Sequence, residues 1–407
     1  MALTTWLVPG LAAAERVVFI NTEPVVLNNA GGQDPTQDSY NTTGFVPGPA
    51  SGWPGLTEAQ QVQLLYWLKE ASVPFDIVYT FQRPANGTYD MVVLGSAADN
   101  AALFPDLGCS AAIGIADCED ANDENISFLF WGCMNANDQA DMHRVAFNIF
   151  AGLGFGWGLE NLSVTGQIMG NYTVNALEFG NSCANIDGTQ LCATHPGCAD
   201  GSMNSTADLT QRIGLRVDDG PPVVSITAPE DNTVVSPDVM VEANVGDLFG
   251  GLEVVLEVVE VGQSLQDNQP PYGWSLTGIP QGTWTLRVTA TDADMNSVSE
   301  EVTICVDLPE CGAPPASDSS GGGDSSTGGL DTSGGGDSTT GEILITTGDV
   351  DPPAPPPMTT GAPSAPTTFG TDTPETGCQC RANGSGAPGP GMTLLSLLLL
   401  GAFIRRE

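Results

Sequence analysis

Apolar and polar positions in the first half of the chain alternate in short runs that predict a mixture of strands and helices. Thr57 and Gln60 form a capping box ahead of apolar residues at helical spacing, which predicts a helix over 58–70. A second helix is expected from Asp138, as its N-cap, to about residue 153. Runs rich in β-branched and aromatic residues predict strands at 16–20, 25–27, 75–81, 91–94 and 126–131. This order is typical of an α+β domain.

A different pattern begins at Pro221 and Pro222. Short alternating segments, separated by turn signals, predict a β-sandwich over 219–311, with strands at 239–245, 252–261, 283–290 and 301–306. With a strand at 282–286 followed by an Asp-rich turn at 290–294, this region resembles the immunoglobulin-like domains of bacterial surface proteins. The resemblance implies a spacer or an adhesive unit.

The chain then loses its large apolar residues. Gly, Ser, Thr, Asp and Pro dominate 312–377, and such a composition predicts a disordered stalk because it cannot bury enough apolar surface to fold. The last segment, 378–407, holds an apolar run of 13 residues from Met392 to Ile404, followed by two arginines. A spanning helix needs roughly 17–25 residues, so this short membrane segment is expected to be processed.

The C-terminal thirty residues resemble the myxobacterial sorting signal called MYXO-CTERM, in which a Cys-x-Cys pair precedes a short transmembrane segment and a basic tail. The resemblance implies cleavage by a sorting protease of the secretion pathway, lipid on Cys378 or Cys380, and retention on the outer membrane at the cell surface. An unprocessed C-terminal anchor would give the same outward topology. At the other end, an apolar stretch closed by three alanines at 12–14 predicts a signal peptide over 1–14 and export.

Composition narrows the choice of partners. Forty-nine acidic residues oppose ten basic ones, for a formal charge of −39, which would repel nucleic acid. In an exported chain, cysteines favour disulfides over thiol chemistry. We expect Cys305 to pair with Cys311, whereas the sequence leaves the pairing of the other six open. The disulfide candidates outside the sorting pair are Cys109, Cys118, Cys133, Cys183, Cys192, Cys198, Cys305 and Cys311.

The stretch 145–160 resembles the active-site helix of a metzincin-type zinc protease whose chemistry has been lost. In that family, His-Glu-x-x-His-x-x-Gly-x-x-His supplies three zinc ligands and the glutamate that activates water. Aligned on the glycine, these positions are Phe147, Asn148, Ala151, Gly154 and Trp157, and Met169 takes the place of the family's Met-turn. The resemblance implies a degenerate head over 15–218 without catalysis. A plain buried core helix would carry the same apolar residues.

The count of histidines supports the same conclusion independently. A catalytic zinc generally has three protein ligands, and this chain has only His143 and His195. Residues one helical turn from His143 cannot ligate. His195 is expected to be a solvated residue of the loop between Cys192 and Cys198, two cysteines that favour disulfides over thiolate ligands. Carboxylate pairs are the remaining catalytic candidates, and they would come from Asp117, Glu119, Asp120 and Glu160.

Calcium is the one metal that the composition favours. Asp292, Asp294 and Asn296 carry oxygen ligands at alternate positions, a spacing that lets an extended loop surround a hard cation. The same turn occurs in immunoglobulin-like domains without an ion.

These observations favour an exported protein anchored at the cell surface, whose inactive protease-like head binds a protein or glycan ligand. It would need no cofactor other than this calcium. Two alternatives stay open, a secreted surface hydrolase with a non-standard site and a structural protein of the envelope.

Overall fold

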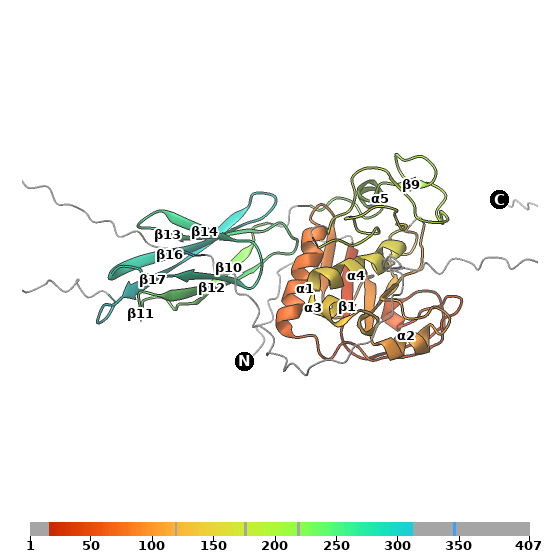
Figure 1. Ribbon diagram of the computed structural model, residues 1–407, viewed down its shortest axis with the longest axis horizontal. Helices are drawn as coiled ribbons and strands as arrows, with labels where there is room; N and C mark the ends of the chain where they lie inside the picture. The colour runs from red at the N-terminus through yellow and green to blue at the C-terminus, as the bar shows by residue number, and fades with distance from the viewer. Residues whose placement is uncertain (1–15, 119, 175–176, 218–219, 312–344, 347–407) are drawn as a thin grey trace, which may run out of the picture.

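The computed structural model describes residues 16–118, 120–174, 177–217, 220–311 and 345–346. It is a mixed α/β multidomain fold, in which a head and a β-sandwich lie next to each other (Figure 1). Within the described ranges, every helix is too short or too polar to cross a bilayer. The predicted signal peptide, nearly all of the predicted stalk and the C-terminal segment with Cys378 and Cys380 lie outside them.

A five-stranded sheet forms the centre of the head, in the order β4-β1-β5-β7-β6. Its strands are β1 (Arg16–Asn21), β4 (Ile77–Thr80), β5 (Asp90–Gly95), β6 (Ala112–Ile113) and β7 (Ile126–Phe130). The first four in spatial order are parallel, and β6 runs antiparallel to β7. Four of the five predicted strands enter this sheet, and the fifth, β2 (Val25–Leu27), pairs with β3 (Gly48–Ala50).

Two hydrophobic cores lie on the two faces of this sheet, because successive strand residues point to opposite faces. One core joins the sheet to α1 (Glu58–Ala71) and α4 (Met142–Gly156), and its sheet residues include Val18, Val92 and Leu129. The other core contains Phe19, Val93 and Phe128, together with Leu103 of α2 (Ala97–Leu103). The head therefore has three layers: α1 with α4, the sheet, and a layer that contains α2. The loops that follow α4 cover the side of this helix that faces away from the sheet.

The predicted helix beginning at Asp138 is wrong in its start. The structure has a short α3 (Ala136–Ala140) and then α4, because Asp141 is extended and its carboxylate accepts the N–H groups of His143 and Arg144 as the N-cap of α4. The capping box of α1 is confirmed, with Thr57 and Gln60 bonded reciprocally.

Close packing explains one glycine of α4. A Cβ on Gly152 would lie 3.2 Å from the Cβ of Ser127 on β7 and 3.3 Å from a carbonyl oxygen of β6. Glycine at this position lets the helix approach the sheet backbone closely.

All eight cysteines outside the sorting pair form disulfides. The pairs are Cys109–Cys133, Cys118–Cys192, Cys183–Cys198 and Cys305–Cys311. The predicted pairing of Cys305 with Cys311 is confirmed. Two bridges fix the segment after α4, which contains β8 (Ala184–Asn185), β9 (Ser202–Met203) and α5 (Ser205–Arg212).

The second domain is a sandwich of two sheets. One has the order β10-β12-β15-β18, with β10 (Val223–Ala228), β12 (Val239–Gly246), β15 (Tyr272–Leu276) and β18 (Ile345–Thr346). The other has the order β11-β17-β16-β13-β14, with β11 (Thr233–Val235), β13 (Glu253–Val258), β14 (Gln263–Asp267), β16 (Gly282–Thr291) and β17 (Ser297–Val306). The predicted strand at 252–261 ends early at Val258, where the chain turns into β14. Part of the predicted stalk pairs with β15 through β18.

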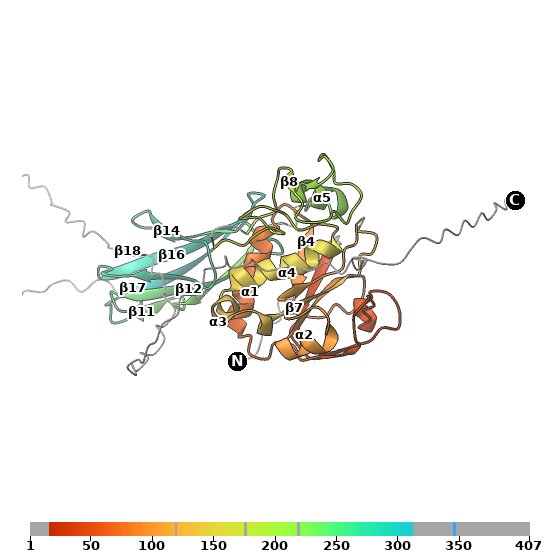
Figure 2. The same ribbon diagram turned by 45° about the vertical axis from the view of Figure 1, so that its right-hand side comes forward.

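The sandwich contacts the carboxyl end of α1, beside which both views place it (Figure 2). Lys69 Nζ donates to the Asp247 carbonyl at 2.5 Å, and the Glu70 carboxylate accepts the Gly251 N–H at 2.7 Å. Arg216, from the linker between the domains, pairs with Asp294 at 2.5 Å. Charged side chains therefore join the two domains through specific bonds.

We expect Gly250→Ala to loosen this interface. A Cβ there would lie within 2.8 Å of backbone atoms of Lys69 and Glu70, which cannot move independently of α1. Lys69 is the only lysine of the chain. The acetylation rate of Lys69, measured by peptide mass spectrometry, should be roughly tenfold higher in the variant. The state in which the two domains are separated and Lys69 is exposed would be more populated. Gly246→Ala, where the added Cβ meets only ordinary contact at 3.5 Å, is the control; equal rates in the two variants would contradict the described interface.

Candidate functional site

The positions that would hold zinc in a metzincin-type protease are buried and apolar or amide-bearing here. Phe147 packs edge-on against Tyr172, with ring centroids 5.2 Å apart, under the guanidinium of Arg144. Asn148 is fully buried and donates from Nδ2 to the Arg144 carbonyl at 2.9 Å. Ala151 is 1 % exposed. None of the three side chains supplies an imidazole, thiolate or carboxylate, so these residues do not fit a zinc ion.

Trp157 packs against Phe150 and binds Asp90. Seven residues separate it from Phe150, about two helical turns, so the two share one face, and their rings lie 6.3 Å apart. The fully buried indole donates from Nε1 to Asp90 Oδ2 at 2.8 Å. The third ligand position of the motif is therefore occupied by a packing residue that binds a buried carboxylate at the start of β5.

Gly154 and Met169 come into contact. The place of a Cβ on Gly154 is taken by the Met169 thioether, and Met169 itself has a positive φ of 72°. Of the motif positions, these two are joined directly, although they are 15 residues apart in sequence. Any larger residue at 154 would require the Met169 side chain to shift.

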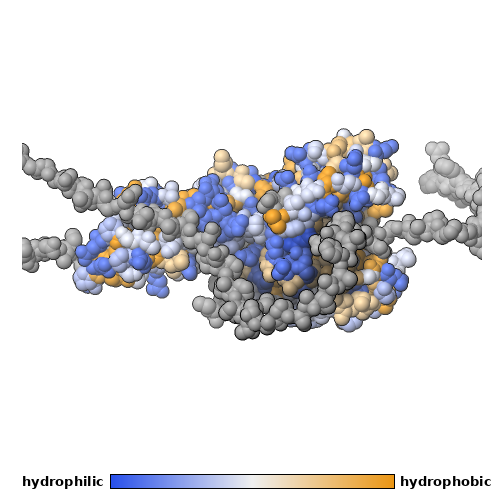
Figure 3. Space-filling model, viewed as in Figure 1, coloured by the Kyte–Doolittle hydropathy of each residue, from blue (hydrophilic) through white to orange (hydrophobic). Residues whose placement is uncertain are grey.

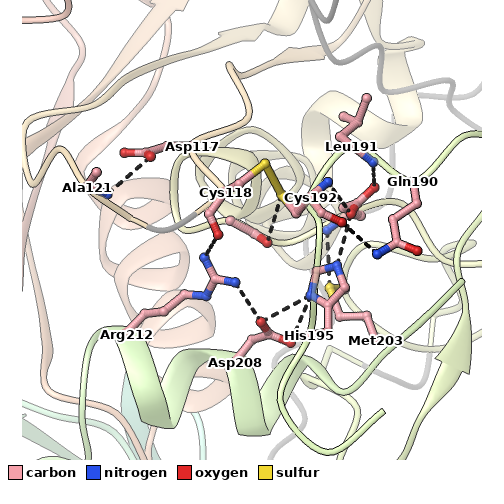
Figure 4. Close-up of a disulfide and its surroundings, with 12 residues drawn as sticks. Asp117, Cys118, Ala121, Gln190, Leu191, Cys192, His195, Met203, Asp208 and Arg212 are labelled. Carbon is pink, nitrogen blue, oxygen red and sulfur yellow. Dashed lines mark hydrogen bonds and ion pairs between the residues drawn. A yellow bond between two sulfur atoms is a disulfide. The ribbon is translucent and has the colours of Figure 1, made fainter. Parts of the chain in front are cut away.

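A buried ionic cluster lies beyond the end of α4 (Figure 4). His195 donates from Nδ1 to Asp208 of α5 at 3.1 Å and from Nε2 to Glu160 at 2.9 Å. Glu160 also accepts the backbone N–H groups of Leu191 and Cys192, at 2.6 and 3.0 Å. The His195 side chain has no exposed surface, so the prediction of a solvated loop histidine is wrong.

Charge explains why this imidazole can be buried. Burial alone would lower the pKa of His195, but hydrogen bonds and attraction from Asp208 and Glu160 outweigh it and raise the pKa to about 9. Both ring nitrogens are donors to carboxylates, so neither is free to act as a base toward a nucleophile. Arg212 extends the cluster, from Asp208 at 2.9 Å to the Cys118 carbonyl beside the Cys118–Cys192 disulfide. The cluster fastens the cysteine-rich segment to the head.

Stability should therefore fall between pH 6.5 and 9. A folded-state pKa above the unfolded value of about 6.5 means that the contribution of His195 is fully present below pH 6.5 and lost as pH rises through about 9. Burial lowers the pKa of His143, so the titration of His143 changes the stability only below pH 6.5. Thermal unfolding followed across the window should show the decline. Asp120, whose pKa burial raises to about 7, also titrates in the lower part of the window, so His195→Gln should be flat only from about pH 8 to 9. A decline of equal size in His195→Gln would contradict the assignment.

The predicted catalytic carboxylates are held in internal bonds. Glu160 belongs to the His195 cluster, and Asp117 accepts the N–H groups of Ala121 and Asn122 at 3.1 and 2.8 Å. Glu119 lies outside the described residues.

Asp120, another of these candidates, shares Arg16 with Asp90, which was not among them. Arg16 lies 2.5 Å from Asp120 and 3.4 Å from Asp90. Burial raises the pKa of Asp90 to about 6 and that of Asp120 to about 7, although Arg16 opposes both shifts. Both side chains are at most 2 % exposed, so substrate has no access to them. We interpret the pair as structural.

Asp292 and Asp294 of the predicted calcium loop take part in internal bonds. Asp292 accepts the N–H groups of Asp294 and Asn296, both at 2.8 Å, and the Asn296 side-chain amide at 2.9 Å. Asp294 pairs with Arg216 at the domain interface. In the part of the chain that the structure describes, no group of three His, Cys, Asp or Glu residues is suited to a metal, and calcium at this loop stays a prediction.

Two cavities were not predicted from the sequence. One, of about 430 Å³, lies beside His195 and Arg212. The other, of about 630 Å³, is lined by residues at the carboxyl end of β1, including Asn21, and by Phe81 and Arg83 after β4. The cavity at β1 could have been located only from a general rule, that ligands tend to bind at the carboxyl ends of parallel strands.

Comparison with known proteins identifies part of the chain. Residues 222–288 match the family model of the bacterial Ig domain, which confirms the predicted immunoglobulin-like sandwich. No curated protein matches the chain.

Three solved structures with similarity to the chain have TM-scores too low to support an argument about the head. The fibronectin(III)-like modules of Clostridium thermocellum CbhA are 26% identical, over 21% of this chain and 96% of that chain, with a TM-score of 0.19. The PKD1 domain of Vibrio anguillarum Epp is 20% identical, over 23% and 100%, with a TM-score of 0.18. OgpA from Akkermansia muciniphila is 11% identical, over 71% and 92%, with a TM-score of 0.21.

Proposed function

We propose that this protein is an exported, surface-anchored binding or adhesion protein whose metzincin-like head has no catalytic activity. The observation that carries the proposal is the replacement of the zinc ligands on α4 by Phe147 and Ala151, with Asn148 in place of the catalytic glutamate. Filling such a site with apolar side chains removes the cost of desolvating a cation and its ligands. The contact between Gly154 and Met169 supports the descent from a protease.

Surface display is supported by the disulfides and by the bacterial Ig domain. Disulfides persist in oxidising surroundings. On the face seen in Figure 3, hydrophobic residues are scattered among hydrophilic ones, as suits a protein exposed to water. The polar contacts between head and sandwich would hold the head away from the anchor.

Proteolysis tests the absence of catalysis. The purified chain is incubated with casein, with added zinc and with or without a chelator. We expect no cleavage above that of the buffer. Chelator-sensitive cleavage would favour the alternative, a surface hydrolase with a non-standard site.

Anchoring has its own prediction. If the C-terminal segment is a processed sorting signal, intact mass spectrometry of the surface fraction should show a chain without 392–407 and with lipid on Cys378 or Cys380, because a 13-residue span holds a surface protein poorly. One acyl chain alone gives marginal membrane binding, so a second chain or further contacts are expected. An unmodified chain ending at Glu407 would identify the segment as a plain anchor.

A further inference from the structure

The cavity at the carboxyl end of β1 is built by three segments that converge at one edge of the head's sheet. β1 and β4 are parallel neighbours, so their carboxyl ends, at Asn21 and Thr80, meet at this edge. The start of β2 closes the third side, and the cavity measures about 630 Å³. This is enough room for a small organic ligand, since such sites typically measure about 300–1,000 Å³.

Asn21 gives the cavity an unused hydrogen-bond donor. The residue is 3 % exposed and lines the cavity. Its Oδ1 accepts the N–H of Glu23 at 3.2 Å, which fixes the orientation of the amide, because the flipped amide would place two donors against each other. Its Nδ2 is buried and has no hydrogen-bond partner within the described residues. A buried donor without a partner is costly, so a ligand with an acceptor would be stabilised here.

Carboxylates stand beside this donor. Glu23 is exposed at the cavity, and Asp38 is held by Arg83 at 2.6 Å. Arg83 is itself fixed, because it donates to the Pro35 carbonyl at 2.9 Å and lies over the Phe19 ring. The ligand must therefore offer donors to carboxylates and an acceptor to the amide within a short distance.

Apolar side chains form the rest of the wall. Phe81 is half-buried, and Val26 is 70 % exposed although it lines a cavity. Exposed aliphatic and aromatic surface next to fixed polar groups is typical of a ligand site.

We propose that this cavity binds a neutral carbohydrate, which would be the surface ligand of the proposed function on which this inference rests. A sugar hydroxyl is both donor and acceptor, so neighbouring hydroxyls can bond Glu23 and Asn21 together. The C–H face of the ring would lie against Phe81 and Val26. An anionic ligand would be repelled by Glu23 and by the charge of the chain, because the charges of Arg83 and Asp38 balance each other. A cationic group alone cannot satisfy Asn21 Nδ2, because both are donors.

Saturation-transfer NMR on the full chain tests this assignment. The probes are glucose, galactose, mannose, N-acetylglucosamine and N-acetylgalactosamine, and acetyl-Lys-Arg-amide is tested in parallel. We expect at least one sugar to bind, and Asn21→Ala and Glu23→Gln each to weaken that binding about tenfold, the effect of losing one good hydrogen bond to a polar or charged group. Gln211→Ala, which alters the other cavity, should leave it unchanged.

Phe81→Ala is a second cavity variant in case Asn21→Ala fails to fold. It changes only the apolar wall of the cavity, and it should also weaken sugar binding. Circular dichroism confirms that each variant is folded. Binding of no sugar, binding of the cationic dipeptide in place of sugars, or sugar binding that survives all three cavity substitutions would overturn the proposal. These outcomes are independent of the casein assay. If the sugar proposal fails, the proposal that the head has no catalytic activity is unaffected.

Discussion

Replacing Trp157 by alanine should lower the free energy of unfolding of the head by about 3–5 kcal/mol, the cost typical of deleting a large buried aromatic side chain. The indole is fully buried against Phe150, so its removal leaves a cavity. It also leaves Asp90 without the donor at 2.8 Å. Chemical unfolding followed by circular dichroism measures the loss and avoids a change of fluorescent reporter.

Trp157→Phe is the matched control. Phenylalanine keeps most of the ring but cannot donate to Asp90, so the expected loss is smaller, about 1–3 kcal/mol. If Trp157→Ala were as stable as the unsubstituted chain, the placement of the indole in the core would be wrong.

Glu160→Ala should cost about 3–5 kcal/mol, because it removes one of the two carboxylates that bind the buried imidazolium of His195. The imidazolium of His195 would keep only Asp208, and the N–H groups of Leu191 and Cys192 would lose their acceptor. Unfolding is measured under oxidising conditions, so that the Cys118–Cys192 disulfide stays closed.

Glu160→Gln separates charge from shape. The amide oxygen can still accept one of the backbone bonds, but it cannot balance the imidazolium, so an intermediate loss is expected. Equal stability of Glu160→Ala and the unsubstituted chain would show that the cluster contributes nothing, and the pH dependence assigned to His195 would then need another cause.

Local signals in the sequence were sufficient for much of the fold. The capping box at Thr57 fixed the start of α1, and β-branched runs located β1, β5 and β7 within a residue or two. The start of α4 was wrong because two Asx residues, Asn135 and Asp141, each cap a helix and divide a segment that reads as one. Weakly apolar strands such as β14 carry no strong periodic signal.

The candidate sites depended on contacts that no local pattern contains. His195 lies 35 residues from Glu160 and 13 from Asp208, and only the folded chain brings the three together. The unpartnered Nδ2 of Asn21 is likewise found only in the folded chain, where β2 and the loop after β4 lie around it. The lack of metal ligands at Phe147, Asn148 and Ala151, by contrast, could be predicted from residue identity alone.

The zinc content of the purified chain tests the central claim most directly. Elemental mass spectrometry after incubation with zinc and removal of loosely bound ions should find far less than one zinc per chain, because Phe147, Asn148 and Ala151 offer no ligands on the buried face of α4. About one zinc per chain, retained through this treatment and released only by a strong chelator, would contradict the account.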